Sequence, residues 1–389
     1  MNKKDIANIR KQFKLNNDLL RIKEIFNVYV QKETGEIYFH VSQPFQLIEQ
    51  EAQELFLKNF KKVLTGQLDS KLFELKFVQG IENSTQTTLY EGLHAHSTDE
   101  WKEYMLSVVE KMYEKNVYSF DTVVTFIRGE YRKPKRRKNY ELEEDGSEET
   151  YASPFILCSV NKIDQPKKTL LFDYVEKTFK SSNDVDPIIN LTSPLTGFFF
   201  PAFNDNAADV NHILYYTGKV NQPDYQFIEE VLNCEEILTA QDDKAIFEHI
   251  LKEVVGEKVD AEVISNVYEE LDRIIVENEE SEEMEESAPP TIDSKDIEKI
   301  LTVSGVENVS TQIVEHAIKS VLDDEKHEFK ANSLVPKTIK IETKVADLTI
   351  KPKDLRNMKY IMFEGKRCLL LEIDDDVIVE GFKLEEAKL

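Results

Sequence analysis

The feature that most constrains the fold is an acidic segment in the last third of the chain. Seven of the ten residues 277–286 are glutamate, and Pro289-Pro290 follow them. No Lys or Arg lies between Arg273 and Lys295 to offset this charge. Like charges at this density repel one another and offer little apolar surface, so the sequence predicts a flexible, disordered acidic linker over residues 277–292. The rest of the chain must then fold as separate bodies.

Length and periodicity predict how those bodies are built. The 389 residues are enough for two or three domains. We expect a main region over residues 1–276, with a sub-boundary near residue 115, and a C-terminal module over residues 293–389. The main region alternates helical and strand patterns, which predicts a mixed α/β region with a largely antiparallel sheet. The module reads as two helices against a small antiparallel sheet, so the predicted fold class is α+β.

Several local patterns in the main region place individual elements. Glu33-Thr-Gly-Glu36 between two apolar runs predicts a hairpin, and residues 46–64 have helical periodicity. Ser97 and Glu100 form a capping box for a helix with an apolar inner face. That face is expected to hold Trp101, Met105, Val108, Val109 and Met112. Residues 122–128 and 154–160 are apolar and β-branched, which predicts two strands of a buried sheet.

Charge and cysteine usage indicate the compartment. The net charge of −25 repels nucleic acid and anionic membranes on average. No apolar run approaches the ~20 residues that a bilayer crossing needs, and no secretory signal is recognisable at the start. The three cysteines, Cys158, Cys234 and Cys368, are far apart and form no Cys-x-x-Cys pair, which favours free thiols in a reducing environment. We therefore expect a cytoplasmic protein without a membrane partner.

Residues 197–217 concentrate the residue types that build sites. Asp205, Asp209 and His212 follow one another at i, i+4 and i+7, so a helix would bring two carboxylates and an imidazole to one face. Such a set holds a divalent metal or serves as acid and base, which makes these residues the catalytic candidates of a metal-dependent hydrolase.

A structural interpretation of the same segment competes with the catalytic one. An Asp can cap the next helix, and His212 lies beside an apolar stripe. Six aromatic residues are then expected in the core rather than on a binding platform: Phe198, Phe199, Phe200, Phe203, Tyr215 and Tyr216. We favour this interpretation because no further cluster completes a metal set. His94-Ala-His96 has a metal-ligand spacing but no other ligands nearby, so we expect neither a metal nor a cofactor.

A charged arm joins the two predicted strands. Its first half contains six cations, Arg132, Lys133, Lys135, Arg136, Arg137 and Lys138. Residues 141–149 contain six carboxylates, so the halves cancel. The arm is either a solvated hairpin extension, which we favour, or a phosphate-binding arm that a nucleic-acid partner frees from its acidic half.

Four segments in chain order resemble the bacterial domain-of-unknown-function 4317 family. They are Asp5–Phe13, the hairpin from Phe126 to Cys158 that ends in Phe155–Ser159, Gly197–Thr217, and the final segment from Gly365–Asp374 to Gly381. The resemblance covers nearly the whole chain and implies a cytosolic protein of about this length, but it supplies no activity, cofactor or catalytic residue that could be carried over to this chain. Asn204 and Asn206 depart from its pattern, where Asp and Arg are expected. Asp347–Leu355 is in addition similar to the closing strand and turn of bacterial nucleoid-associated proteins.

Motif absences point away from catalysis. The sequence contains no phosphate-binding loop, no Gly-x-Gly-x-x-Gly, no His-Glu-x-x-His and no Gly-x-Ser-x-Gly. We expect a non-enzymatic protein whose partner is another macromolecule, a protein in the first place, because a flexible linker lets two bodies engage together. The alternatives are a nucleic-acid- or nucleoid-associated protein that uses the basic arm, and the metal-dependent hydrolase.

Overall fold

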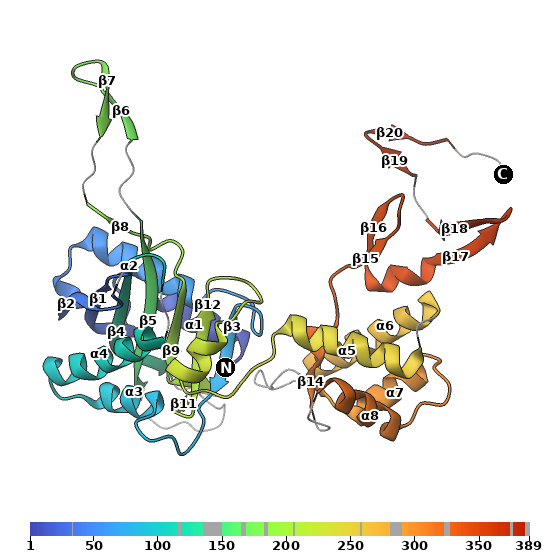
Figure 1. Cartoon of the computed structure of the whole chain (residues 1–389), viewed down its shortest axis with the longest axis horizontal. Coiled ribbons are helices and arrows are strands. Elements are labelled where there is room, and N and C mark those ends of the chain that lie inside the picture. The colour runs from blue at the N-terminus through green and yellow to red at the C-terminus, as the bar shows by residue number, and fades with distance from the viewer. Residues whose placement is uncertain are drawn as a thin grey trace, which may run out of the picture. The chain divides into compact units, whose positions relative to one another are not determined.

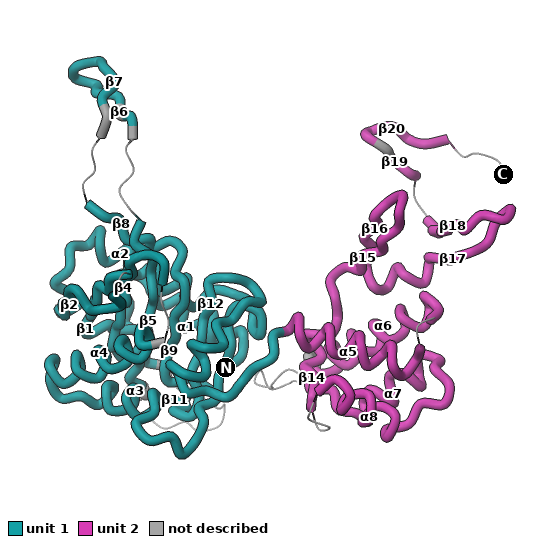
Figure 2. Tube along the Cα trace, in the orientation of Figure 1, with its two compact units in different colours: residues 1–239 teal, residues 240–389 magenta. Residues whose placement is uncertain are grey.

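The computed structural model divides the chain into two compact units, residues 1–239 and residues 240–389 (Figure 2). It describes residues 1–32, 34–115, 118–134, 150–164, 169–182, 186–204, 207–256, 259–280, 290–322, 327–373 and 376–385. Within these ranges no helix combines the length and the hydrophobicity of a membrane span.

Unit 1 is built on an antiparallel sheet of eight strands (Figure 1). Its order is β2-β1-β4-β5-β9-β12-β3, and the short β8 pairs with β5. The strands are β1 (Leu20–Val30), β2 (Ile37–Pro44), β3 (Leu72–Lys76), β4 (Thr122–Pro134), β5 (Thr150–Asp164), β8 (Ile188–Ile189), β9 (Thr196–Phe200) and β12 (His212–Thr217). The predicted turn at Gly35 joins β1 and β2, and the hairpin is confirmed.

Helices cover both faces of this sheet. One face packs against α1 (Lys3–Gln12) and α2 (Gln50–Val63), and the other against α3 (Thr85–His94), α4 (Thr98–Lys115) and a π-helical turn at Phe227–Val231. Successive side chains of a strand point to opposite faces of the sheet, so the core is divided into two apolar clusters, one on each face. Phe198 and Phe200 of β9 enter the α4 side, whereas Phe199 between them enters the α1 side.

The capping box at Ser97 is confirmed as the start of α4. The Ser97 hydroxyl accepts from the Glu100 N–H at 3.1 Å. The Glu100 carboxylate accepts from the His96 N–H at 2.8 Å, one residue before the expected donor. All five apolar side chains predicted for the inner face are buried, so this helix is positioned by its own sequence pattern.

Two hairpins in unit 1 lie outside the main sheet. β6 (Thr169–Asp173) pairs with β7 (Thr178–Ser182), and β10 (Ala202–Asn204) pairs with β11 (Ala207–Asp209). The second hairpin connects β9 to β12 and so carries the central motif.

Unit 2 has a helical core. It consists of α5 (Ala240–Val255), α6 (Ala261–Glu280), α7 (Ser294–Val303), α8 (Thr311–Val321) and α9 (Ala331–Leu334). A two-residue pair, β13 (Thr291–Ile292) with β14 (Phe329–Lys330), closes one side. Apolar side chains from all these elements form one cluster, with Phe247 of α5 packed edge-on against Phe329 at 6.1 Å.

Three hairpins and a 3₁₀ helix complete unit 2 (Figure 1). The hairpins are β15 (Ile339–Glu342) with β16 (Asp347–Ile350), β17 (Met358–Phe363) with β18 (Lys366–Leu371), and β19 (Ile378–Val379) with β20 (Phe382–Lys383). The 3₁₀ helix spans Pro352–Asn357. Glu364 and Gly365 both have positive φ, which confirms the predicted two-residue turn of the second hairpin.

The α+β class is confirmed, but two details differ from the sequence prediction. The C-terminal strands form separate two-stranded hairpins rather than one sheet, because their apolar side chains remain largely exposed and no common face is buried. The unit boundary falls at residue 240 rather than in the acidic segment, since α5 and α6 share a core with α7 and α8. Residues 277–280 are the last turn of α6, and residues 281–289 lie outside the described residues.

Candidate functional site

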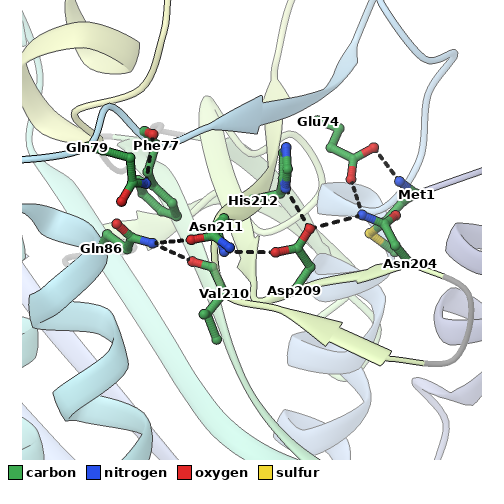
Figure 3. A network of polar contacts seen from close by, with 10 residues as sticks. All are labelled: Met1, Glu74, Phe77, Gln79, Gln86, Asn204, Asp209, Val210, Asn211 and His212. Carbon is green, nitrogen blue, oxygen red and sulfur yellow. Dashed lines mark hydrogen bonds and ion pairs between the residues drawn. The ribbon is translucent and has the colours of Figure 1, made fainter.

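Asp209 and His212 meet at the turn between β11 and β12. The His212 Nδ1 lies 2.6 Å from the Asp209 carboxylate (Figure 3). The other carboxylate oxygen accepts from the Asn211 N–H at 3.0 Å. Both side chains are partly buried. They meet across a tight turn between two strands. The helix that would have placed positions i, i+4 and i+7 on one face is therefore not formed at Asp209 and His212.

Hydrogen bonds decide the electrostatics of Asp209. Partial burial alone would raise the pKa of its carboxyl group. The Asn211 N–H, the His212 ring and the Asn204 amide favour the ionised form and together hold the pKa below its ordinary value. The carboxylate is thus ionised at neutral pH and orients the imidazole.

The surroundings come from elements far apart in the sequence. The Asn204 amide donates to Glu74 of β3 at 2.8 Å and lies 3.5 Å from Asp209. The amino group of Met1 contacts the same Glu74 carboxylate (Figure 3). Gln86 of α3 donates to the Val210 carbonyl at 2.9 Å and thereby fixes the turn.

This arrangement resembles a structural network more than a catalytic one. Each carboxylate oxygen of Asp209 already has a partner within the turn. Asp205 lies outside the described residues. Among the residues that the structure does describe, no three His, Cys, Asp or Glu side chains are grouped to hold a metal ion. A positioned Asp–His pair can move a proton, but none of the residues drawn in Figure 3 is a Ser, Thr, Cys or Lys whose side chain it could activate.

The aromatic residues of the motif are packed. All six are buried, as expected. Phe199 stacks on Phe155 at 5.3 Å, and Phe203 packs edge-on against Tyr131 at 5.7 Å. These rings provide core volume and leave no aromatic platform for a nucleic-acid base at this segment.

Only the root of the basic arm is described. Arg132 and Lys133 end β4, whereas Lys135, Arg136, Arg137, Lys138 and the acidic half lie outside the described residues. Arg132 lies 3.8 Å from Glu130, and Lys23 of β1 lies 2.5 Å from the same carboxylate. The hydrogen bond from Lys23, followed by the charges of Arg132 and Arg21, lowers the pKa of Glu130.

His94 and His96 are both exposed and lie at the junction of α3 and α4. His94 is the last residue of α3, where its Nδ1 lies 2.9 Å from the Tyr90 carbonyl. His96 follows in the turn before α4. Both histidines thus lie at the surface beside the start of α4, and not on a strand that would turn both rings to one face.

Sequence reasoning missed a buried ion pair on the α4 side of the sheet. Arg128 of β4 donates two hydrogen bonds to Glu24 of β1, at 2.9 and 2.7 Å, and lies over the Trp101 ring at 5.1 Å. Ser42 of β2 also donates to Glu24. The available signal was Glu24 in strand alternation with the apolar Phe26, Val28 and Val30, which marks a charge that needs a buried partner.

Fold and site together define a two-unit α+β protein without a recognisable catalytic centre in its described residues. The family model described as "Domain of unknown function (DUF4317)" matches residues 1–382, and the chain belongs to this family. No curated protein and no solved structure matches the chain significantly.

Proposed function

We propose that this chain is a non-enzymatic protein that binds another protein, and that the binding surface lies in unit 2. The observation that carries this proposal is the apolar surface of the β17–β18 hairpin. Tyr360 and Met362 of β17 are 69% and 66% exposed, and Leu371 of β18 is 40% exposed. Burying apolar side chains of this size under a partner lowers the free energy of the complex.

The register places these side chains on one face of the hairpin. Met358 pairs with Leu371, Tyr360 with Leu369, and Met362 with Arg367, so all six lie on the same side. An isolated two-stranded hairpin is marginally stable in water. A protein partner that covered this face would stabilise it.

A groove adjoins the hairpin within unit 2. Its volume is about 880 Å³, and it lies between the α5–α6 turn, β15, the 3₁₀ helix and β17. The floor is apolar and includes Leu251, Val255, Ile264, Val267, Ile339, Ile341 and Ile361. A cavity of this volume holds a ligand of drug-like size, so it has room for a few apolar side chains of a partner.

Charges at the groove favour a polypeptide with acidic residues. Lys252, Lys340, Arg356 and Lys359 line it together with Glu248, Asp260 and Glu262. The lining therefore carries one net positive charge in a chain whose net charge is −25. An amphipathic segment with apolar anchors and a few carboxylates matches this composition.

Site-specific photocrosslinking tests the proposal. A photoreactive residue at Met362 should crosslink the chain to a discrete protein in cells that express it, whereas one at Val345, which is 95% exposed in the same unit, should not. The double variant Tyr360→Ser with Met362→Ser should lose that partner without losing unit 2 helicity. Equal crosslinking at both positions, or a partner that the double variant retains, would contradict the proposal.

Nucleic-acid binding is the second candidate function, supported by the cluster of Arg21, Lys23 and Arg132 around one carboxylate, Glu130. It predicts DNA or RNA binding at roughly 50 mM salt that weakens steeply as salt rises. Arg136→Ala with Arg137→Ala should weaken binding, and neutralising the acidic residues of 141–149 should strengthen it. Binding that does not respond to salt would exclude this function.

A further inference from the structure

Strand β2 forms one edge of the unit 1 sheet (Figure 1). It pairs with β1 over seven register positions, from Glu24 opposite Pro44 to Val30 opposite Ile37. Among the described strands, β1 is its only partner. The outer side of β2 therefore presents a row of backbone N–H and C=O groups.

This edge lacks the charges that normally protect one. Residues 37–48 contain no Asp, Glu, Lys or Arg, although 32% of the chain is charged. Soluble proteins discourage pairing at edge strands with charged side chains, with proline, with bulges or with short length. Pro44 stands at the end of β2, and the one bulge in the pairing lies at the other end, at Tyr29/Val30. Tyr38 is the extra residue at this bulge, and residues 39–43 contain no charge, proline or bulge.

Apolar side chains extend from both faces of the same strand. Tyr38 is 69% exposed and Phe39 is 60% exposed, and Val41 is also exposed. Tyr38 packs edge-on against Tyr29 at 5.7 Å, and His40 packs edge-on against Phe26 at 5.6 Å. The strand is thus held by β1 on its inner side, and none of the described strands pairs with its outer side.

We propose that β2 pairs antiparallel with β2 of a second copy of this chain. A second copy suits this strand, because residues 37–48 carry no Asp, Glu, Lys or Arg and two identical strands can therefore pair without like charges opposite each other. Antiparallel pairing of a strand with itself is two-fold symmetric, so each contact is made twice. In the register centred on His40, Phe39 lies opposite Val41 of the second copy, an aromatic and β-branched pair of the stabilising kind. This inference does not depend on the function proposed for unit 2.

Two measurements on the full-length chain, its molar mass in solution and its amide hydrogen exchange, together test whether β2 pairs with β2 of a second copy. Light scattering at micromolar concentration should give twice 45.2 kDa. Amides of β2 should become protected as the concentration rises, which locates the interface on this strand. Val41→Lys should weaken dimerisation at least about tenfold, since it places a charged side chain opposite Phe39 of the other copy, and symmetry makes this change twice.

Matched variants separate the interface from folding. Val220→Lys changes an exposed valine elsewhere in unit 1 and should leave the dimer intact. Phe39→Lys offers a second disruption if Val41→Lys fails to fold, as judged by circular dichroism. A wild-type chain that is monomeric at all these concentrations would overturn the proposal. A dimer that persists in the folded lysine variants with unprotected β2 amides would overturn it as well.

Discussion

The sheet of unit 1 and the C-terminal hairpins of unit 2 use similar apolar residues to opposite effect. In the sheet, Phe198, Phe199 and Phe200 are all fully buried, because helices cover both faces of β9. In β17 and β18, Tyr360, Met362 and Leu370 lie exposed. The difference shows that strand propensity alone does not bury a strand, and that a second layer must be available to cover it.

The largest expected effect on stability comes from comparing a buried ring of the sheet with an exposed ring of the hairpin. Phe199→Ala removes a ring packed between α1, α2 and the sheet, and it should lower the free energy of unfolding by about 3–5 kcal/mol. Tyr360→Ala removes an exposed ring and should change it by less than about 0.5 kcal/mol. Urea unfolding of both variants gives the two values. Equal losses would mean that the hairpin is covered within the chain itself.

The next effect concerns the buried charge pair. Arg128→Met leaves Glu24 buried without its cation and should cost about 3 kcal/mol. Exposed Lys76 pairs with Glu235 at 2.8 Å, and Lys76→Met should cost less than about 1 kcal/mol. The double variant Glu24→Gln with Arg128→Met should recover part of the loss, which a double-mutant cycle measures. A single-variant loss as small as that of Lys76→Met would show that Glu24 reaches water.

A smaller effect tests the close contact of α2 with the sheet. A Cβ at Gly197 would lie 2.5 Å from the Cys158 carbonyl oxygen and 3.0 Å from Val63 of α2. Gly197→Ala should therefore destabilise unit 1 by about 1–3 kcal/mol through overpacking. Val220→Ala, at an exposed position, serves as its control in thermal unfolding. A neutral Gly197→Ala would mean that both the β5 backbone at Cys158 and α2 can move away from β9.

The smallest effect is the pH dependence that Asp209 contributes. Its pKa is lowered in the folded state, so its stabilisation is fully present above the unfolded value of about 3.9. That stabilisation is lost as the pH falls through the folded pKa. Asp209→Asn should flatten this part of the profile and cost less than about 1 kcal/mol at neutral pH. Unfolding curves at pH values below about 5 compare the two proteins, and identical slopes would contradict the assignment.

Much of unit 1 was predictable because its signals are local. The five apolar residues of α4 follow the helical period, and a capping residue precedes them. The turn at Gly35 lies between two apolar runs, so the hairpin follows from neighbouring residues.

The candidate site was less predictable because long-range pairing assembles it. Asp209 and His212 were recognised, but the strand–turn–strand geometry replaces the expected helix. Glu74 reaches the network only because β3 pairs with β12 at the far edge of the sheet. No periodicity in the sequence predicts that β3 pairs with β12. The boundary between the units was not predicted, for the same reason. Contacts of α5 with α8 and α9 join segments that lie on both sides of the acidic run.

The position of Trp101 has a practical consequence for spectroscopy. It is the one tryptophan of the chain, it is fully buried in unit 1, and the Arg128 guanidinium lies over its ring. Its indole emission therefore follows the melting of one unit, whereas far-ultraviolet ellipticity sums over both. Comparing the two signals during heating would reveal whether the units melt in concert or one after the other, without any label being introduced.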